Sequence, residues 1–123
     1  MPSTTPYNFG DVVLVAFPFT NLQASKKRPA VIISNHTYQQ TRPDVILMAI
    51  TSQIKTELVP GEAILQDWQI AGLAKPSMLK PLIATLEQAN IVRVMGQLSV
   101  TDREELGNVL QKILGGQIKR VKS

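Results

Sequence analysis

The sequence contains no cysteine and only one histidine, His36. Without cysteine the chain can form no disulfide, and it has neither a thiolate metal ligand nor a cysteine nucleophile. A single histidine also excludes a pair of histidines acting as acid and base. Because His36 sits in a polar stretch, we expect an ordinary surface residue. The carboxylates are scattered along the chain, so we expect neither a bound metal nor another cofactor.

Long apolar runs are missing as well. No stretch approaches the roughly 18 residues that a membrane helix needs, so we expect no membrane association. The N-terminus MPSTTPYNFGD lacks the basic and apolar regions of a signal peptide, which favours a cytoplasmic protein. Neither GxGxxG nor GxxxxGK[ST] occurs, so no nucleotide-phosphate loop is indicated. Aromatic residues make up only 5% of the chain.

The length of 123 residues predicts a single domain, residues 1–123. We divide it into a loose N-terminal arm (1–8), a folded region (9–114) and a basic tail (115–123). The formal net charge is +4, and cations gather at 26–28 and in the tail. This balance is compatible with a polyanionic partner, either a nucleic acid or an acidic protein.

Short apolar stretches that are rich in β-branched residues and bounded by turn residues predict strands. The predicted strands cover residues 11–17, 30–34, 44–50, 62–65, 77–86 and 91–98. Pro81 predicts that the fifth strand is irregular or lies at an edge. Gly96 in the sixth predicts a bulge or a close packing contact.

One long helix is predicted at the end of the chain. Thr101-Asp-Arg-Glu104 has the form of a capping box with Thr101 as N-cap. Apolar residues recur behind it at helical spacing up to Leu114, and Gly115 can end the helix. Residues 67–71 fit a single helical turn, and 35–43 a polar loop. The expected fold is mainly β (β-rich α+β), a small barrel or strongly bent sheet with a C-terminal α-helix.

Two polar residues flank neighbouring predicted strands. Arg28 stands immediately before the second strand, and Thr51 immediately after the third. If these strands pair antiparallel, the start of one lies beside the end of the other. Arg28 and Thr51 would then meet at one rim of the sheet. An arginine fork binds phosphate with two hydrogen bonds, and a threonine hydroxyl can donate to a phosphate oxygen.

Two interpretations of this rim stay open from residue types alone. It is either a solvated Lys-Lys-Arg loop beside a polar turn, or a phosphate site. RNA brings its own nucleophile, the 2′-hydroxyl, so its cleavage needs only positioning and charge stabilisation. Such chemistry requires neither a metal nor a histidine.

Three segments together resemble the MazF/PemK family of toxin endoribonucleases. They are GDVVLVAFPFT, KKRPAVIISN and ILMAITSQI, and a terminal helix follows MGQLS. The resemblance covers residues 9 to about 114, with the same order and spacing. The Gly-Asp pair, the Arg-Pro-Ala that follows about 17 residues later, and the Thr-Ser-Gln carry most of it.

The resemblance implies an SH3-like barrel with short helices, usually as a homodimer. It implies cleavage of single-stranded RNA, chiefly mRNA, at short sequences, leaving a 2′,3′-cyclic phosphate and a 5′-hydroxyl. A cognate antitoxin would silence the toxin by lying across its RNA groove. The family's catalytic arginine and threonine fall on Arg28 and Thr51. The loop 18–27 matches the family's mobile loop over the RNA.

Further RNA contacts follow from this resemblance: Lys26, Lys27, Ser52, Gln53, Ser77 and Lys80. Base stacking would use rings such as Phe17, Phe19, Tyr38 or Trp68. One departure is Gln23, where many members carry an acidic residue, so the RNA sequence preference can differ. Two alternatives remain: a gyrase poison built on the same barrel and acting through its C-terminal helix, or a barrel that binds RNA or protein without catalysis.

Overall fold

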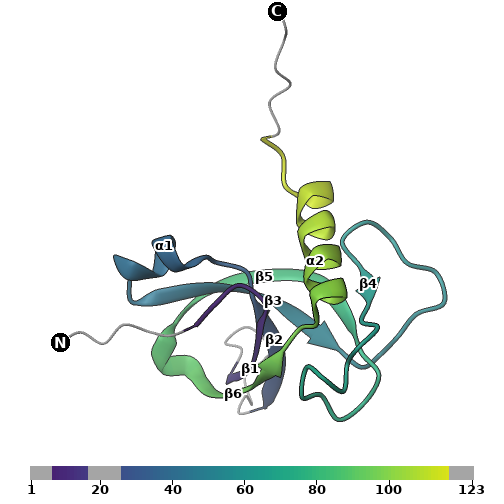
Figure 1. The fold of residues 1–123 in the computed structure, drawn as a ribbon, viewed down its shortest axis with the longest axis horizontal. Coiled ribbons are helices and arrows are strands. Elements are labelled where there is room, and N and C mark those ends of the chain that lie inside the picture. Colours follow the sequence, from purple (N-terminus) through teal and green to yellow (C-terminus); the bar gives the residue numbers. More distant parts are fainter. Residues whose placement is uncertain (1–6, 17–25, 117–123) are drawn as a thin grey trace, which may run out of the picture.

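A computed structural model describes residues 7–16 and 26–116 of the chain. Its six antiparallel strands form one bent sheet, in the order β4-β5-β3-β2-β1-β6 (Figure 1). The strands are β1 (Asp11–Ala16), β2 (Lys27–Ile32), β3 (Asp44–Thr51), β4 (Ala63–Ile64), β5 (Met78–Glu87) and β6 (Ile91–Gln97). The helices are α1 (His36–Gln40), the 3₁₀ turn η1 (Gln88–Asn90) and α2 (Val100–Ile113). The predicted class, mainly β with a C-terminal helix, is confirmed.

Some expectations lie wholly or mostly outside the described residues. They are the loose arm over 1–6, most of the loop 18–27 with Gln23, the rings of Phe17 and Phe19, and the tail from 117 onward. In the part of the chain that the structure describes, no helix is both long and apolar enough to cross a membrane.

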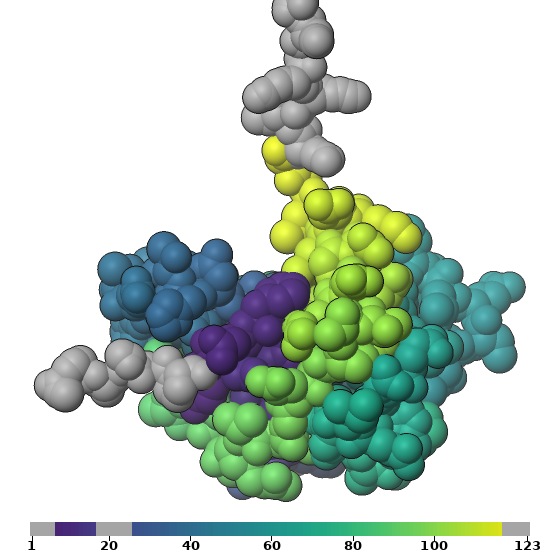
Figure 2. Space-filling model, viewed as in Figure 1, coloured from purple at the N-terminus to yellow at the C-terminus, as the bar shows by residue number. Residues whose placement is uncertain are grey.

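The sheet has an apolar core on each face. On the α2 side, Val12, Val31 and Met48 pack with Leu106 and Val109 of the helix. Figure 2 shows α2 lying between β1 (purple) and the segment that precedes β5 (teal). The opposite face is formed by Val13, Val15, Ala30, Ile32, Val45, Leu47 and Ala49. Side chains alternate across a strand, and burial on both faces explains why these strands are continuously apolar.

The second strand begins earlier than predicted. We expected residues 30–34, whereas β2 covers Lys27–Ile32. The ladder with β1 continues through Leu14 opposite Pro29 and Val15 opposite Arg28. Arg28 is therefore fixed inside a strand rather than in the preceding loop. Thr51 likewise closes β3, one residue beyond the predicted end.

The bulge signals in the last two strands are confirmed. Register along β5 skips from Ile83 opposite Met48 to Lys80 opposite Ala49, so the irregularity falls at Pro81. On β6 a register shift separates Val94 from Gly96.

The predicted N-cap of the terminal helix is wrong. Ser99, not Thr101, caps α2, and its Oγ accepts from the backbone N–H of Asp102 at 3.2 Å. The helix ends at Ile113, so Gly115 follows the C-cap residue Leu114 as expected. Leu114 itself is exposed rather than part of the core.

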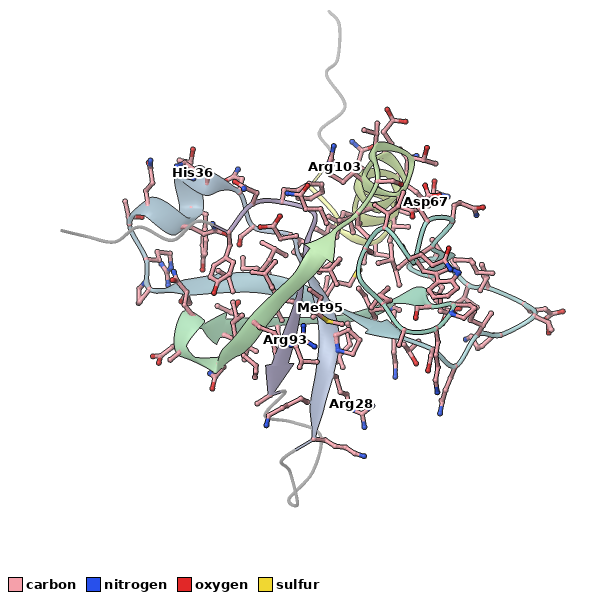
Figure 3. The ribbon with its side chains drawn as sticks, turned by 60° about the horizontal axis from the view of Figure 1, so that its bottom comes forward. Arg28, His36, Asp67, Arg93, Met95 and Arg103 are labelled. Carbon is pink, nitrogen blue, oxygen red and sulfur yellow. The ribbon has the colours of Figure 1, made fainter. Side chains whose placement is uncertain are left out.

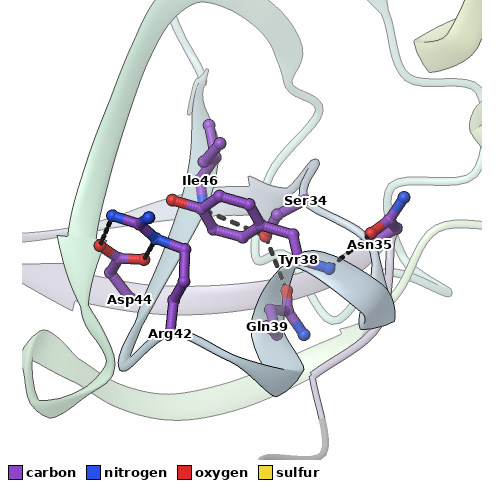
Figure 4. A network of polar contacts seen from close by, with 7 residues as sticks. All are labelled: Ser34, Asn35, Tyr38, Gln39, Arg42, Asp44 and Ile46. Atoms are coloured by element: carbon purple, nitrogen blue, oxygen red, sulfur yellow. Dashed lines mark hydrogen bonds and ion pairs between the residues drawn. The ribbon is translucent and has the colours of Figure 1, made fainter.

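The predicted polar loop 35–43 contains a short helix, α1 (Figure 4). Asn35 caps it by accepting from the N–H of Tyr38 at 2.9 Å. The buried Gln39 binds the Ser34 hydroxyl at 2.6 Å, and that hydroxyl also accepts from the N–H of Ile46 at 3.1 Å. Arg42, which donates to Asp44 at 3.1 Å, lowers the pKa of that carboxyl group. This polar network fixes α1 to the start of β3.

Candidate active site

A cavity of about 720 Å³ opens near the end of β3 that carries Thr51. Its walls come from β2, β3 and the start of β5, and from the segment before β5. The lining residues are Lys27, Arg28, Pro29, Ala49, Ile50, Thr51, Ser52, Gln53, Leu73, Ala74, Lys75, Ser77, Lys80, Leu82 and Met95. Seven of the eight residues predicted for the site therefore line one cavity. Lys26 is exposed but does not line it.

Arg28 and Thr51 stand at the point where β2 and β3 part. The ladder between these strands runs from Ile32 opposite Leu47 to Ala30 opposite Ala49, and ends there. Continued by two residues, this register sets Arg28 opposite Thr51. Each residue is held by its other neighbour, Arg28 by β1 and Thr51 by β5. The cavity thus opens between two fixed strands.

All the charged side chains that line the cavity are cations. Lys27, Arg28, Lys75 and Lys80 contribute to its walls, and no aspartate or glutamate among the described residues does so. The ion pairs found among the described residues, Arg42–Asp44 and Lys55–Glu62, leave these four without a carboxylate within 4.0 Å. An uncompensated positive cleft attracts a polyanion.

The Thr51 hydroxyl has a defined orientation. Its Oγ1 accepts from the backbone N–H of Gln53 at 3.1 Å. This local turn uses the oxygen as an acceptor and leaves the O–H proton to donate. A donor beside an arginine suits a phosphate oxygen.

Ser77 lies differently from expectation in one respect. Its side chain lines the cavity, yet the residue is only 3% exposed. Its hydroxyl donates to the carbonyl of Lys75 at 2.9 Å. With that proton committed, Ser77 can offer an RNA strand only an acceptor.

The wall formed by residues 73–77 is held against β6 by backbone contact. Gly72 has φ +85°, and a Cβ on it would collide with the Met95 carbonyl. A Cβ on Gly96 would lie 2.6 Å from the Ala71 carbonyl. The predicted helical turn at 67–71 is present: the N–H of Ala71 donates a hydrogen bond to the Asp67 carbonyl at 3.2 Å. Glycine at both positions lets two backbones meet.

Three further candidates within the described residues lie outside the cavity: His36, Tyr38 and Trp68. His36 is exposed, as expected of a surface residue. Figure 3 shows that it lies far from Arg28. Trp68 packs against the core. The ring of Tyr38, a residue of α1, lies under the Arg42 guanidinium. Neither aromatic residue lines the cavity. The residues that the structure describes contain no group of three metal-ligating side chains.

Sequence reasoning missed Lys75 and the apolar lining residues Leu73, Ala74 and Met95. They come from an irregular segment and from β6, where no local pattern indicates a site. Their position depends on the Gly72–Gly96 contact, which joins residues 24 positions apart.

A family model described as PemK-like, MazF-like toxin of type II toxin-antitoxin system matches residues 8–114. The chain belongs to this family. Membership makes it a toxin of a type II toxin–antitoxin system. No curated protein sequence is close enough to count as a match.

Solved structures of MazF toxins share the fold. MazE-MazF (Form-II) from Deinococcus radiodurans is 18% identical, with a TM-score of 0.66 over 93% of this chain and 98% of that chain. An endoribonuclease in complex with its cognate antitoxin, from a mycobacterial species, is 16% identical. Its TM-score is 0.65, over 86% and 91% of the two chains. Mycobacterium tuberculosis toxin MazF-mt6 is 18% identical, with a TM-score of 0.62 over 82% and 96%.

Proposed function

We propose that this MazF/PemK toxin is a metal-independent, sequence-specific endoribonuclease. It cuts single-stranded RNA, chiefly mRNA, and thereby inhibits translation and growth. One observation carries the proposal: Arg28 and Thr51 line the same cavity, and no carboxylate among the described residues lines it. The register of β2 and β3, extended by two residues, would set the pair opposite one another. The structural relatives named as endoribonucleases add support.

In the proposed reaction the RNA supplies its own nucleophile. The 2′-oxygen attacks the adjacent phosphorus, the bond from phosphorus to the 5′-oxygen breaks, and a 2′,3′-cyclic phosphate forms. The 2′-hydroxyl loses one proton to water, and the departing 5′-oxygen gains one to become a 5′-hydroxyl. Within residues 7–16 and 26–116, no carboxylate or histidine lines the cavity to carry these protons.

Arg28 and Thr51 act on the charge that develops during this step. The Arg28 guanidinium binds the scissile phosphate and stabilises the departing oxygen, because arginine stays charged. Thr51 donates its free proton to the same phosphate and so aligns the 2′-hydroxyl for attack. The proposed RNA contacts are Lys26, Lys27, Ser52, Gln53, Ser77 and Lys80.

The decisive experiment is cleavage of mixed-sequence single-stranded RNA in excess EDTA. We expect the unmodified protein to cut it and to leave cyclic phosphate ends. Arg28→Ala and Thr51→Ala should each lower kcat by about 100-fold or more, as removal of one transition-state donor does. Thr51→Ser should retain most activity because it keeps the hydroxyl.

Arg42→Ala provides a matched control, since it removes an exposed arginine that lies before the start of β3. It should cleave at the unmodified rate. Intact RNA at every sequence tried would remove the nuclease proposal. Undiminished cleavage by Arg28→Ala would instead remove the site assignment alone.

We also propose that the toxin is a homodimer and that its cognate antitoxin lies across the RNA cavity. Two of the structural relatives were solved with their antitoxins. An mRNA substrate places the activity in the cytoplasm.

A further inference from the structure

Lys75 occupies an exposed tip on the cavity wall. Residues 74–76 are exposed, whereas Leu73 before them and Ser77 after them are buried. Lys75 comes from the segment before β5, whereas Arg28 and Thr51 come from β2 and β3. The lysine therefore adds a cation to the cavity from a different part of the fold.

Both ends of this tip are held in place. At its start, the N–H of Leu73 binds the Trp68 carbonyl at 3.1 Å, and Gly72 lies against β6. At its end, the Ser77 carbonyl accepts from the N–H of Leu65 at 3.0 Å, and its hydroxyl binds the Lys75 carbonyl. The backbone under Lys75 is thus positioned while its side chain is free to extend.

The charge of Lys75 is less compensated than that of Lys80. The β4–β5 register continues from Ala63 opposite Leu79 to set Glu62 opposite Lys80. Lys80 also lowers the pKa of Glu62, behind the larger effect of Lys55. Neither ion pair among the described residues involves Lys75.

We propose that Lys75 binds a second phosphate of the same RNA strand, beside the phosphate held by Arg28 and Thr51. The inference rests on the proposed endoribonuclease function and deepens it. The preferred substrate then carries at least two consecutive phosphates across the cavity. Lys75 makes no bond and moves no proton; it fixes the strand electrostatically.

The test compares Lys75→Gln with Lys112→Gln. Lys112 is an exposed lysine on α2 that does not line the cavity, so both variants lose one positive charge. The probe is a labelled mixed-sequence RNA, 2′-O-methylated throughout so that it binds without being cleaved. Affinity is measured between 50 and 300 mM KCl.

We expect Lys75→Gln to bind about three- to tenfold more weakly at 150 mM salt. The slope of log affinity against log salt should be smaller by about 0.7, the value for one phosphate contact on a single strand. Lys112→Gln should match the unmodified protein, and Lys75→Arg should recover both values. On cleavable RNA, KM should rise for Lys75→Gln while kcat stays constant.

Failure of the second-phosphate site can be told apart from failure of the nuclease proposal. If the unmodified protein binds and cuts RNA while Lys75→Gln behaves like Lys112→Gln, the second-phosphate site is wrong and the nuclease proposal stands. A lowered kcat with unchanged KM would also overturn it. If the unmodified protein neither binds nor cuts RNA, both proposals fail together.

Discussion

At the scale of single residues, the contacts of Glu62 favour its ionised form. Its carboxylate pairs with Lys55 Nζ at 2.7 Å and accepts from the N–H of Val59 at 3.0 Å. These contacts, with the Lys55 interaction largest, hold the pKa of Glu62 below its ordinary value of 4.5. The ionised form is therefore favoured in the folded chain and closes the loop between β3 and β4.

This depressed pKa predicts how stability depends on pH. Because the folded pKa is the lower one, the stabilisation is present above pH 4.5 and is lost as the pH falls below that value. Glu62→Gln should melt at a lower temperature than the unmodified protein at pH 6, and the difference should shrink toward pH 3. Thermal melts across that range measure it. A difference that does not change with pH would contradict the role of the charge.

At the scale of an element, helix α2 also positions the backbone of a segment outside the helix. Asp102, only 1% exposed, accepts from the N–H groups of Gln66 at 2.9 Å and Asp67 at 2.8 Å. The buried carboxylate joins the first turn of the helix to the segment that leads to the cavity wall. It is paired with two donors, as buried carboxylates require.

We expect Asp102→Asn to lower the free energy of unfolding by about 2–3 kcal/mol. The amide keeps one acceptor oxygen but turns an NH₂ group toward the second backbone donor. Urea denaturation measures the loss. Glu104→Gln, an exposed change on the same helix, should leave stability within about 0.5 kcal/mol. Equal effects from both variants would show that the Asp102 contacts do not matter.

Strands β1, β2, β3 and β5 could be predicted because each buries several apolar residues of a short apolar run. Strand β6, which has no fully buried residue, was predicted from its β-branched residues. Antiparallel geometry predicted that Arg28 and Thr51 lie near one rim of the sheet. Both do line one cavity, although they lie inside strands rather than beside them. Helix α1 was missed because its five residues show no apolar residues at helical spacing. The helix is stabilised instead by the Asn35 cap and by the hydrogen bond between Gln39 and Ser34. Lys75 was missed because contacts distant in sequence, through Asp102 and Gly96, position its segment.

For the whole molecule, a polyanion is favoured over a neutral ligand by the net charge of +4 and by a cavity whose described lining contains cations and no carboxylate. An acidic antitoxin segment and an RNA strand would then compete for the same cations. Among the described residues, no further strand pairs with β4 or β6, the two edges of the sheet.

We expect static light scattering to give twice the 13.5 kDa of one chain, as a homodimer requires. Adding the cognate antitoxin should displace labelled RNA, and higher salt should weaken both associations because each depends on charge. Fluorescence anisotropy measures the displacement. Simultaneous binding of RNA and antitoxin, without mutual effect, would contradict a shared cavity.

The contact between Gly72 and Gly96 has a consequence for how such a toxin can diversify. A side chain at either glycine would collide with the opposite backbone, so this contact constrains the base of the wall. The exposed residues 74–76 beyond it carry almost no packing and can be exchanged at little cost to folding. If the proposed RNA binding holds, exchanges at these three surface positions would change the contacts to the strand while Arg28, Thr51 and the core stay unchanged.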